Sequence, residues 1–303
     1  MTLEEAKKHH AAQAEIAAAL YTKSLTSDTF AAAWHLALRE SRTRIVEALR
    51  KSKMLSEVGA ALEESGAHMR TFRFLMAPPI SQDQFKLLCP RWNKSGENKG
   101  RPMRHEIANE IAAIFHTWRQ RHLTAWIDQN KKPTKKQMRL VLTSIAPLLA
   151  QQAFGTALRN QRSSEQESAV IKLLGSLGWT RLPSRMVDTR ASIGAKQFMY
   201  KTRFSTGDGG AQEVDIACGL KDTFVLAMEC KVTNDQTNSV KRINDVMKKA
   251  TAWKDHWGNF VETAALLQGV IAPKDVNRLL HAGVHVFWSH DLKTFEAWVI
   301  ART

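Results

Sequence analysis

Three short strand-like segments follow one another closely in the last third of the chain, and their spacing restricts the fold more than any other feature. They cover about Phe198–Phe204, Glu213–Gly219 and Thr223–Val232. The loop Ser205–Gly210 joins the first two, and Leu220–Asp222 forms a tight turn between the second and the third. Connections this short predict that neighbouring segments pair as hairpins.

Helical patterns precede and follow these strands. Ser163 or Ser164 is suited to cap a helix whose apolar positions run from Ala169 to Leu177 and which ends at Gly178. After the third strand we expect a basic amphipathic helix over about 238–257, a strand over 264–271, a helix over 273–282, a strand over 284–289 and a last helix. The order αβββαβ, followed by αβα, predicts an α/β fold with a mixed central sheet flanked by helices.

The first half of the chain has a different character. Residues 1–70 are rich in Ala, Leu, Glu, Lys and Arg and contain almost no Gly or Pro before Gly59, which is typical of helices. Helical character returns over about 104–128, and Thr134 is suited to cap a further helix that runs to about residue 160. We therefore expect two domains, a mostly helical one over residues 1–150 and an α/β one over residues 151–303.

The balance of charge indicates a polyanionic partner. Lys and Arg number 44 against 29 Asp and Glu, a formal net charge of +15. Residues 101–200 alone hold 16 basic and 6 acidic residues, whereas residues 201–303 hold 13 and 12. Basic side chains that neutralise phosphates release condensed counterions, so this charge favours nucleic acid, although some proteins are basic without that role.

Composition disfavours several other environments. The three cysteines, Cys89, Cys218 and Cys230, include no CxxC pair, which argues against a disulfide framework or a cysteine-based zinc site and fits a reducing cytoplasm. The charged first ten residues lack a secretory apolar core. No uninterrupted apolar run approaches the roughly 18 residues that span a bilayer, so we expect no membrane partner.

Three side chains near the turn-linked strands have the chemistry for phosphodiester hydrolysis. The third strand ends in Glu229-Cys230-Lys231, and because side chains alternate across a strand, Glu229 and Lys231 point the same way. The turn at 220–222 brings Asp215 back toward them. Two carboxylates suit Mg²⁺, and Lys231 is placed to orient water or to stabilise charge in the transition state. The competing interpretation is a surface Glu–Lys pair with an unrelated Asp.

Asp215 on one strand and Glu229-Cys230-Lys231 on the next, within αβββαβ, resemble the motif of the PD-(D/E)xK nuclease superfamily. Val214 stands where that motif has Pro. The resemblance implies that Asp215, Glu229 and Lys231 are catalytic and that Asp215 and Glu229 hold the metal. Many members also use a Glu of the preceding helix.

Two glutamates of that helix are candidates for this further role. Glu167 is favoured over Glu165 because it directly precedes the apolar face of the helix. A first-turn Glu that only serves the helix dipole is an equally good interpretation.

Longer stretches resemble type II restriction endonucleases, and more narrowly the XamI-like group. They are APPISQDQFKLLCP (77–90), FGTALRNQRSSEQES (154–168), ECKVTNDQTNSVKRIND (229–245) and VFWSHDL (286–292). The resemblance implies a homodimer that uses Mg²⁺ to cut both strands of double-stranded DNA at a short palindrome. Residues 1–150 would then serve DNA binding or dimerisation.

Compact polar and basic side chains around the catalytic strands are suited to contact DNA. Such groups reach phosphates or base edges, although the same residues would also suit a capping loop followed by a solvated basic helix. Lys248 and Lys249 continue the positive charge along that helix. The candidates are Asn234, Asp235, Gln236, Thr237, Asn238, Ser239, Lys241, Arg242, Arg159 and Arg162.

Three functions are open from the sequence. The first is a type II restriction endonuclease. The second is a DNA repair or junction-resolving nuclease on the same scaffold, which would prefer branched DNA. The third is a DNA-binding protein that does not cleave, for which changing Asp215 or Glu229 would leave every activity intact.

Overall fold

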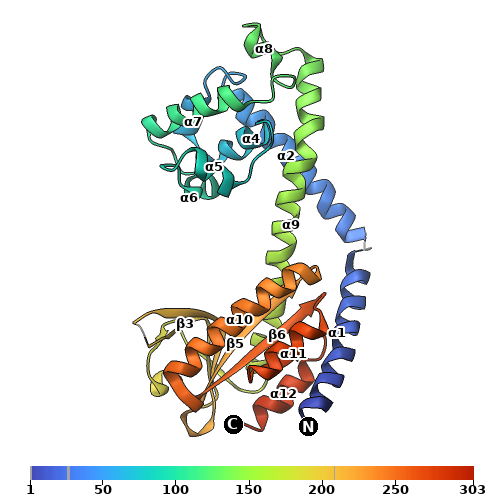
Figure 1. Ribbon diagram of the computed structural model, residues 1–303, viewed down its shortest axis with the longest axis vertical. Coiled ribbons are helices and arrows are strands. Elements are labelled where there is room, and N and C mark those ends of the chain that lie inside the picture. Colours follow the sequence, from blue (N-terminus) through green and yellow to red (C-terminus); the bar gives the residue numbers. More distant parts are fainter. Residues whose placement is uncertain (1, 26–27, 208) are drawn as a thin grey trace. The chain divides into compact units, whose positions relative to one another are not determined.

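The computed structural model describes residues 2–25, 28–207 and 209–303. The chain divides into two compact units. The sheet unit combines Met1–Ser27 with Leu158–Thr303, and the helical unit is Asp28–Ala157 (Figure 1). Asp208 in the expected loop Ser205–Gly210, and residues 1, 26 and 27 of the expected helical region, lie outside the described residues.

A seven-stranded mixed sheet forms the centre of the sheet unit. Its order is β1-β3-β4-β5-β6-β7, with β2 also paired to β3. The neighbours β3, β4 and β5 are antiparallel, and β5, β6 and β7 are parallel. This confirms the mixed sheet and the αβββαβ order. The strands are β1 (Thr180–Arg181), β2 (Met186–Val187), β3 (Gln197–Ser205), β4 (Ala211–Gly219), β5 (Val225–Thr233), β6 (Val261–Gly269) and β7 (His285–Trp288).

Helices cover both faces of this sheet, as expected (Figure 1). On one face Met228 and Cys230 of β5 pack with the C-terminal part of α9 and with α12. On the other face Ala227 packs with Trp253 of α10, and α1 and α11 cover β6 and β7. Because successive residues of β5 face opposite helices, its apolar run is buried on both sides. The helices are α1 (Leu3–Leu25), α9 (Lys135–Ser176), α10 (Gln236–Trp257), α11 (Pro273–His281) and α12 (Leu292–Ile300).

The first helix packs on the sheet rather than with the helices that follow it in sequence. Ala14 and Ala17 of α1 are buried against α11 and the sheet. Nε1 of Trp288 donates a hydrogen bond of 3.1 Å to Nδ1 of His10. The expected helical domain of residues 1–150 therefore differs from the helical unit, which lacks α1 and ends at Ala157. Helix propensity indicates that a segment is helical, but not which surface it covers.

One continuous helix, α9, replaces the two helices expected on either side of residue 161. Thr134 caps its start as predicted, since its Oγ1 accepts a hydrogen bond of 3.2 Å from the backbone N–H of Gln137. The predicted helix start at Ser163 or Ser164 is wrong. Ser163 donates instead to Oε1 of Glu167, at 3.0 Å. Serine is tolerated inside helices, so its capping preference does not by itself interrupt one.

The helical unit has its own apolar core, in which Leu49, Phe72 and Phe115 are fully buried or nearly so. A buried ion pair joins α4 to α6, where Nε and Nη2 of Arg73 donate to the Glu97 carboxylate at 2.9 and 2.5 Å. The helices are α2 (Asp28–Lys51), α3 (Val58–Glu64), α4 (Met69–Phe74), α5 (Gln82–Leu88), α6 (Lys94–Lys99), α7 (His105–Trp118), α8 (Ala125–Asp128) and the first part of α9.

Among the described residues, α9 is the one helix long and apolar enough to cross a membrane by length and composition alone. Its most apolar 18-residue window has a mean hydropathy of 1.3 and is 28% buried. One such helix is weak evidence, because helices of soluble proteins pass the same test. The expectation of no membrane partner is neither supported nor contradicted by it.

Candidate active site

The ladder between β4 and β5 ends just before Asp215 and Glu229. Its last pair is Ile216 opposite Met228, and the same register continued by one residue would set Asp215 opposite Glu229. At this point Oδ2 of Asp215 accepts a hydrogen bond of 2.8 Å from the backbone N–H of Cys230. The two strands therefore separate where the two carboxylates lie, and the Asp215 side chain satisfies a donor of β5.

Glu229 lies among cations beneath α10. Its Oε2 accepts hydrogen bonds from Nζ of Lys231 at 2.6 Å and from Nζ of Lys249 at 2.9 Å. Lys231 also lies 3.2 Å from Oδ2 of Asp245, one turn before Lys249 on α10. Within the described part of the chain, Oε1 of Glu229 is buried and has no hydrogen-bond partner. One carboxylate oxygen is thus held by two ammonium groups, and the other is left to bind a further cation.

Burial and neighbouring charges shift the pKa values of this cluster. Burial raises the pKa of Glu229 above its ordinary value, and Asp215 adds to the rise, while Lys231 and Lys249 oppose it. Burial acts to lower the pKa of Lys231, but Glu229, Asp215 and Asp245 outweigh it, so the pKa of Lys231 is raised. Lys231 is therefore protonated at neutral pH, and its positive charge is available to a bound phosphate.

The oxygen atoms at this place suit Mg²⁺, the ion implied by the family resemblance. No three His, Cys, Asp or Glu side chains of the described residues lie close enough together to hold a metal ion. Magnesium needs only one or two protein carboxylates, because water and substrate oxygens complete its coordination. The unpartnered Oε1 of Glu229 and the carboxylate of Asp215, which is close enough to raise the pKa of Glu229, supply that number.

Glu167 is buried and turned toward β3. Its Oε2 accepts a hydrogen bond of 2.5 Å from the hydroxyl of Tyr200 and lies 3.1 Å from Nζ of Lys201. The pKa of Cys230 is raised by burial, by Asp215 and, to a smaller extent, by Glu167, so the Glu167 carboxylate lies close to β5. Its two oxygens are occupied by Ser163 of α9 and by Tyr200 and Lys201 of β3, and Glu167 is part of no group of three His, Cys, Asp or Glu side chains within the described residues that could hold a metal ion.

Glu165, the alternative to Glu167, is exposed on α9. It accepts a hydrogen bond of 2.8 Å from Nε2 of Gln161, one turn earlier on the same helix. Of the two glutamates, Glu167 is therefore the one that faces the sheet.

The polar segment that begins α10 is only partly accessible. Asp235 is the N-cap, and its Oδ1 accepts a hydrogen bond of 2.7 Å from the backbone N–H of Asn238. Ser239 is fully buried and donates to Oδ2 of Asp275 at 3.0 Å, so it does not reach the surface. The exposed DNA-contact candidates of this region are Asn234, Gln236, Thr237, Asn238, Lys241 and Arg242.

The two arginines proposed on α9 differ in the same way. Arg159 is exposed. Arg162 is buried, its Nη2 donates to Oγ of Ser24 at 2.7 Å, and its guanidinium lies 4.2 Å from the ring centroid of Tyr21. Arg162 therefore fastens α1 to α9, and the structure does not present it to a DNA phosphate.

A cavity of about 460 Å³ lies beside Asp215 and is lined by several cations. Lys201 and Arg203 reach it from β3, and Arg185 comes from the segment before β2. The sequence interpretation did not single out these residues. Lys201 and Arg203 could have been found from their spacing of two, which places them on the same face of β3. This strand pairs with the strand of Asp215, where Thr202 lies opposite Val214.

Lys249 is the other residue whose place the sequence did not reveal. The pattern of a basic amphipathic helix indicates that Lys249 lies on a solvated face. In the structure its side chain is mostly buried and forms an ion pair with Glu229. Its spacing of four from Asp245 was the available signal, since residues four apart share one helix face. Which strand residue that face would meet depended on tertiary packing.

The chain belongs to the XamI restriction endonuclease family, whose sequence model matches residues 52–288, a range that includes the whole β4–β5 hairpin. It is similar to the type II restriction enzyme XamI of Xanthomonas campestris pv. amaranthicola. The two are 29% identical over 215 residues, which are 70% of this chain and 73% of that enzyme.

A solved structure shows a weaker likeness. The crystal structure of protein VC1899 from Vibrio cholerae matches with a TM-score of 0.31 and 11% identity. The match covers 88% of this chain, and the chain spans only 57% of that protein. A similarity at this level supports no conclusion about the site.

Proposed function

We propose that this protein is a type II restriction endonuclease that uses Mg²⁺ to hydrolyse phosphodiester bonds in double-stranded DNA at a short palindromic sequence. The observation that carries the proposal is the placement of Asp215 and Glu229 where β4 and β5 separate, with Lys231 bound to one Glu229 oxygen. Membership in the XamI family supports the class of enzyme, and the name of its relative supports the type II assignment.

Each side chain of the site has a role that follows from its contacts. Asp215 and Oε1 of Glu229 would hold the metal, which when bound polarises the scissile phosphate and acidifies a water molecule. Lys231 carries its positive charge beside the reaction centre and stabilises charge that develops on the phosphate. Glu167 would act as a positioning residue, because it pairs with Lys201, a cation that lines the cavity beside Asp215.

The same cavity is the proposed entrance for the DNA backbone. Lys201, Arg203 and Arg185 would meet phosphates there, and such contacts fix the position of a duplex without reading its sequence. The exposed amide and hydroxyl groups at the start of α10, on Asn234, Gln236 and Thr237, follow directly on the catalytic strand and are suited to base edges. Sequence specificity would arise from this segment and from the helical unit.

A homodimer is proposed because one chain carries one catalytic set. Cutting both strands of a palindrome calls for two sets related by a twofold axis, which a symmetric dimer supplies. The helical unit would contribute DNA contacts or the dimer contact. We expect the enzyme to act in the cytoplasm, without a membrane partner.

Digestion of a sequenced plasmid with Mg²⁺, followed by end mapping, tests the proposal. The wild-type protein should yield discrete fragments with a common terminal sequence. Asp215→Asn and Glu229→Gln should abolish cleavage while gel-shift binding of DNA persists. Asp255→Asn, which changes an exposed carboxylate of α10, serves as the matched control and should cleave normally.

Each other outcome assigns a different function. A random smear would remove sequence specificity from the proposal. Faster cleavage of branched than of linear DNA would favour a repair or junction-resolving nuclease. Activity that survives both Asp215→Asn and Glu229→Gln would show that the site is not catalytic and would favour a DNA-binding protein that does not cleave.

A further inference from the structure

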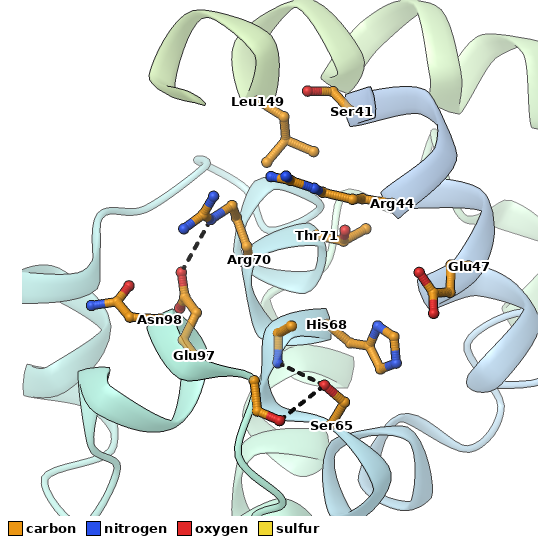
Figure 2. A pocket seen from close by; sticks show the side chains of 12 residues that line it. Ser41, Arg44, Glu47, Ser65, His68, Arg70, Thr71, Glu97, Asn98 and Leu149 are labelled. Carbon is orange, nitrogen blue, oxygen red and sulfur yellow. Dashed lines mark hydrogen bonds and ion pairs between the residues drawn. The ribbon is translucent and has the colours of Figure 1, made fainter. Parts of the chain in front are cut away.

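The helical unit contains a second cavity, of about 420 Å³, that shares no residue with the proposed catalytic site (Figure 2). Its walls come from α2, from the turn and helix around residues 65–71, from α6 and from Leu149 of α9. This volume lies within the roughly 300–1,000 Å³ typical of sites that bind small molecules. The cavity is therefore large enough for an organic ligand.

Three buried polar side chains face this cavity without protein partners. Ser41 and Thr71 are each 2% exposed and His68 is 7% exposed. Among the described residues none of the three side chains makes a hydrogen bond, and none of their polar atoms is sealed away from the cavity. Because these polar atoms are accessible rather than sealed in the interior, they are free to form hydrogen bonds with a molecule that enters the cavity.

Two guanidinium groups converge at one end of the cavity. Figure 2 shows Arg44 of α2 extending toward Arg70 of α4, whose guanidinium group is turned toward Glu97. Arg44 reaches Glu40 only at 3.5 Å, and Arg70 lies 3.7 Å from Oε1 of Glu97, beyond hydrogen-bonding distance. The Glu97 carboxylate is already held by Arg73, as described above. Both arginines therefore keep donors free, and paired guanidinium groups favour phosphate oxygens.

The other end of the cavity offers both donors and acceptors. Figure 2 shows His68 and the carboxylate of Glu47 there, away from the two guanidinium groups. Burial lowers the pKa of His68, and Glu47 opposes this shift. The imidazole is therefore neutral at neutral pH and presents one donor and one acceptor. Groups of this kind recognise a sugar hydroxyl or the edge of a base, not a second phosphate.

We propose that this cavity binds a nucleotide, with its phosphate on Arg44 and Arg70 and its sugar or base against Ser41, His68 and Thr71. The nucleotide comes either from the DNA substrate, turned out of the helical stack, or from solution as a free nucleotide. The chemistry of recognition is the same for both sources. The site is additional to the proposed cleavage function and uses none of its residues.

Isothermal titration of the full-length protein tests the site with the four deoxynucleoside 5′-monophosphates, the matching nucleosides and inorganic phosphate as probes. At least one monophosphate should bind about 10-fold or more tightly than its nucleoside and than inorganic phosphate. The nucleoside lacks the charge-assisted contacts of the phosphate, and inorganic phosphate lacks the polar contacts of the sugar and base. Arg44→Met should weaken that binding about 10-fold or more. Thr71→Val should weaken it by a smaller factor.

Arg39→Met is the matched control, because Arg39 is exposed on the same helix and does not line the cavity. It should leave nucleotide binding unchanged. Arg44 is half exposed, so its replacement tests binding without disturbing the core. Thermal melts of all variants check this directly.

A competition assay separates the two sources. A monophosphate that inhibits plasmid cleavage competitively, with the inhibition lost in Arg44→Met, identifies a nucleotide of the DNA as the occupant. One that binds without affecting cleavage identifies a free nucleotide. Absence of binding by every monophosphate, equal binding of inorganic phosphate, or affinities unchanged in both Arg44→Met and Thr71→Val would overturn the proposal. Asp215→Asn should still bind the nucleotide, so failure of the cleavage proposal is recognised separately.

Discussion

Nζ of Lys249, on α10, lies 2.9 Å from Oε2 of Glu229, the same oxygen to which Lys231 of β5 donates at 2.6 Å. Lys249 also donates to the backbone carbonyl of Glu213 at 2.9 Å, which ties α10 to the strand that carries Asp215. This geometry holds one oxygen of Glu229 in place and leaves the other unpartnered. A helix residue thereby sets the orientation of a strand carboxylate.

Lys249→Met should impair metal use more than folding. Loss of a residue that orients a metal ligand typically lowers metal affinity about 10–100-fold, so the Mg²⁺ concentration for half-maximal cleavage should rise by that factor. Lys249 also opposes the rise in the Glu229 pKa. Without Lys249 the pKa of Glu229 rises further. Because only the ionised carboxylate binds metal, the variant should lose cleavage at a higher pH than the wild-type protein when the pH is lowered.

Cleavage rates measured against pH and Mg²⁺ concentration check both effects. Lys248→Met is the matched control, since Lys248 is the exposed neighbour on α10. Identical profiles for the Lys248 and Lys249 variants would refute the orienting role.

Added Mg²⁺ should raise the melting temperature of the wild-type protein. An ion that binds only the folded state stabilises it by about 2.7 kcal/mol at 100 times its dissociation constant. Glu229→Gln and Asp215→Asn should lose this shift, because each removes one of two proposed ligands. Thermal melts after removal of metal with a chelator, with and without Mg²⁺, give the measurement. An equal shift in wild type and both variants would place the binding of Mg²⁺ elsewhere.

Mild acid should loosen the packing of α1 on the sheet. Burial, with a smaller effect of His9, lowers the pKa of His10 to about 4 from 6.5. Between pH 6.5 and pH 4 the His10 imidazole is protonated in the unfolded chain but stays neutral in the folded chain. The free energy of unfolding is therefore unaffected by this group above pH 6.5 and decreases as the pH falls from 6.5 to 4. The expected loss at pH 5 is about 1–2 kcal/mol.

Urea unfolding at pH 7.5 and pH 5 measures this dependence. His10→Gln cannot titrate in this range and should reduce the difference between the two pH values. An undiminished difference in that variant would assign the acid sensitivity to other groups.

Gly269→Ala should destabilise the sheet unit. Gly269 ends β6 with φ +96°, and a Cβ there would lie 1.9 Å from the carbonyl oxygen of Thr233 at the end of β5. Strain and displacement of this kind should cost about 2–4 kcal/mol. Gly175→Ala in α9 has no atom within 4 Å of its new Cβ and should instead stabilise by about 0.5–1 kcal/mol. Chemical denaturation of both variants compares them, and equal effects would contradict the argument.

Local pattern was enough to predict most of the sheet unit. The turn at 220–222 and the apolar run before Glu229 define a hairpin whose paired residues end one position before Asp215 and Glu229. Period-two and helical patterns are properties of short segments, so they can be read from the residues alone. This is why the strand order αβββαβ and the juxtaposition of the two carboxylates followed from the sequence.

Contacts between distant segments could not be predicted in this way. Arg162 and Ser239 have the residue types of DNA contacts, but Arg162 pairs with Ser24 and Ser239 with Asp275. Glu167 was favoured over Glu165 for its place beside the apolar face of the helix, but this pattern did not predict its partners Tyr200 and Lys201. Burial and partner choice depend on which surfaces meet, and a charged or polar residue carries no local signal of that meeting.

The hydrogen bond between His10 of α1 and Trp288 of β7 joins positions 278 residues apart in the sequence. A ribosome releases the chain from its N-terminus at about 5–20 residues per second, so α1 emerges long before the strand it covers. The helical unit is one contiguous segment, so all of its residues have left the ribosome well before the strands of the sheet unit. We therefore expect the sheet unit to be completed only after β7 has left the ribosome, well after the helical unit can fold.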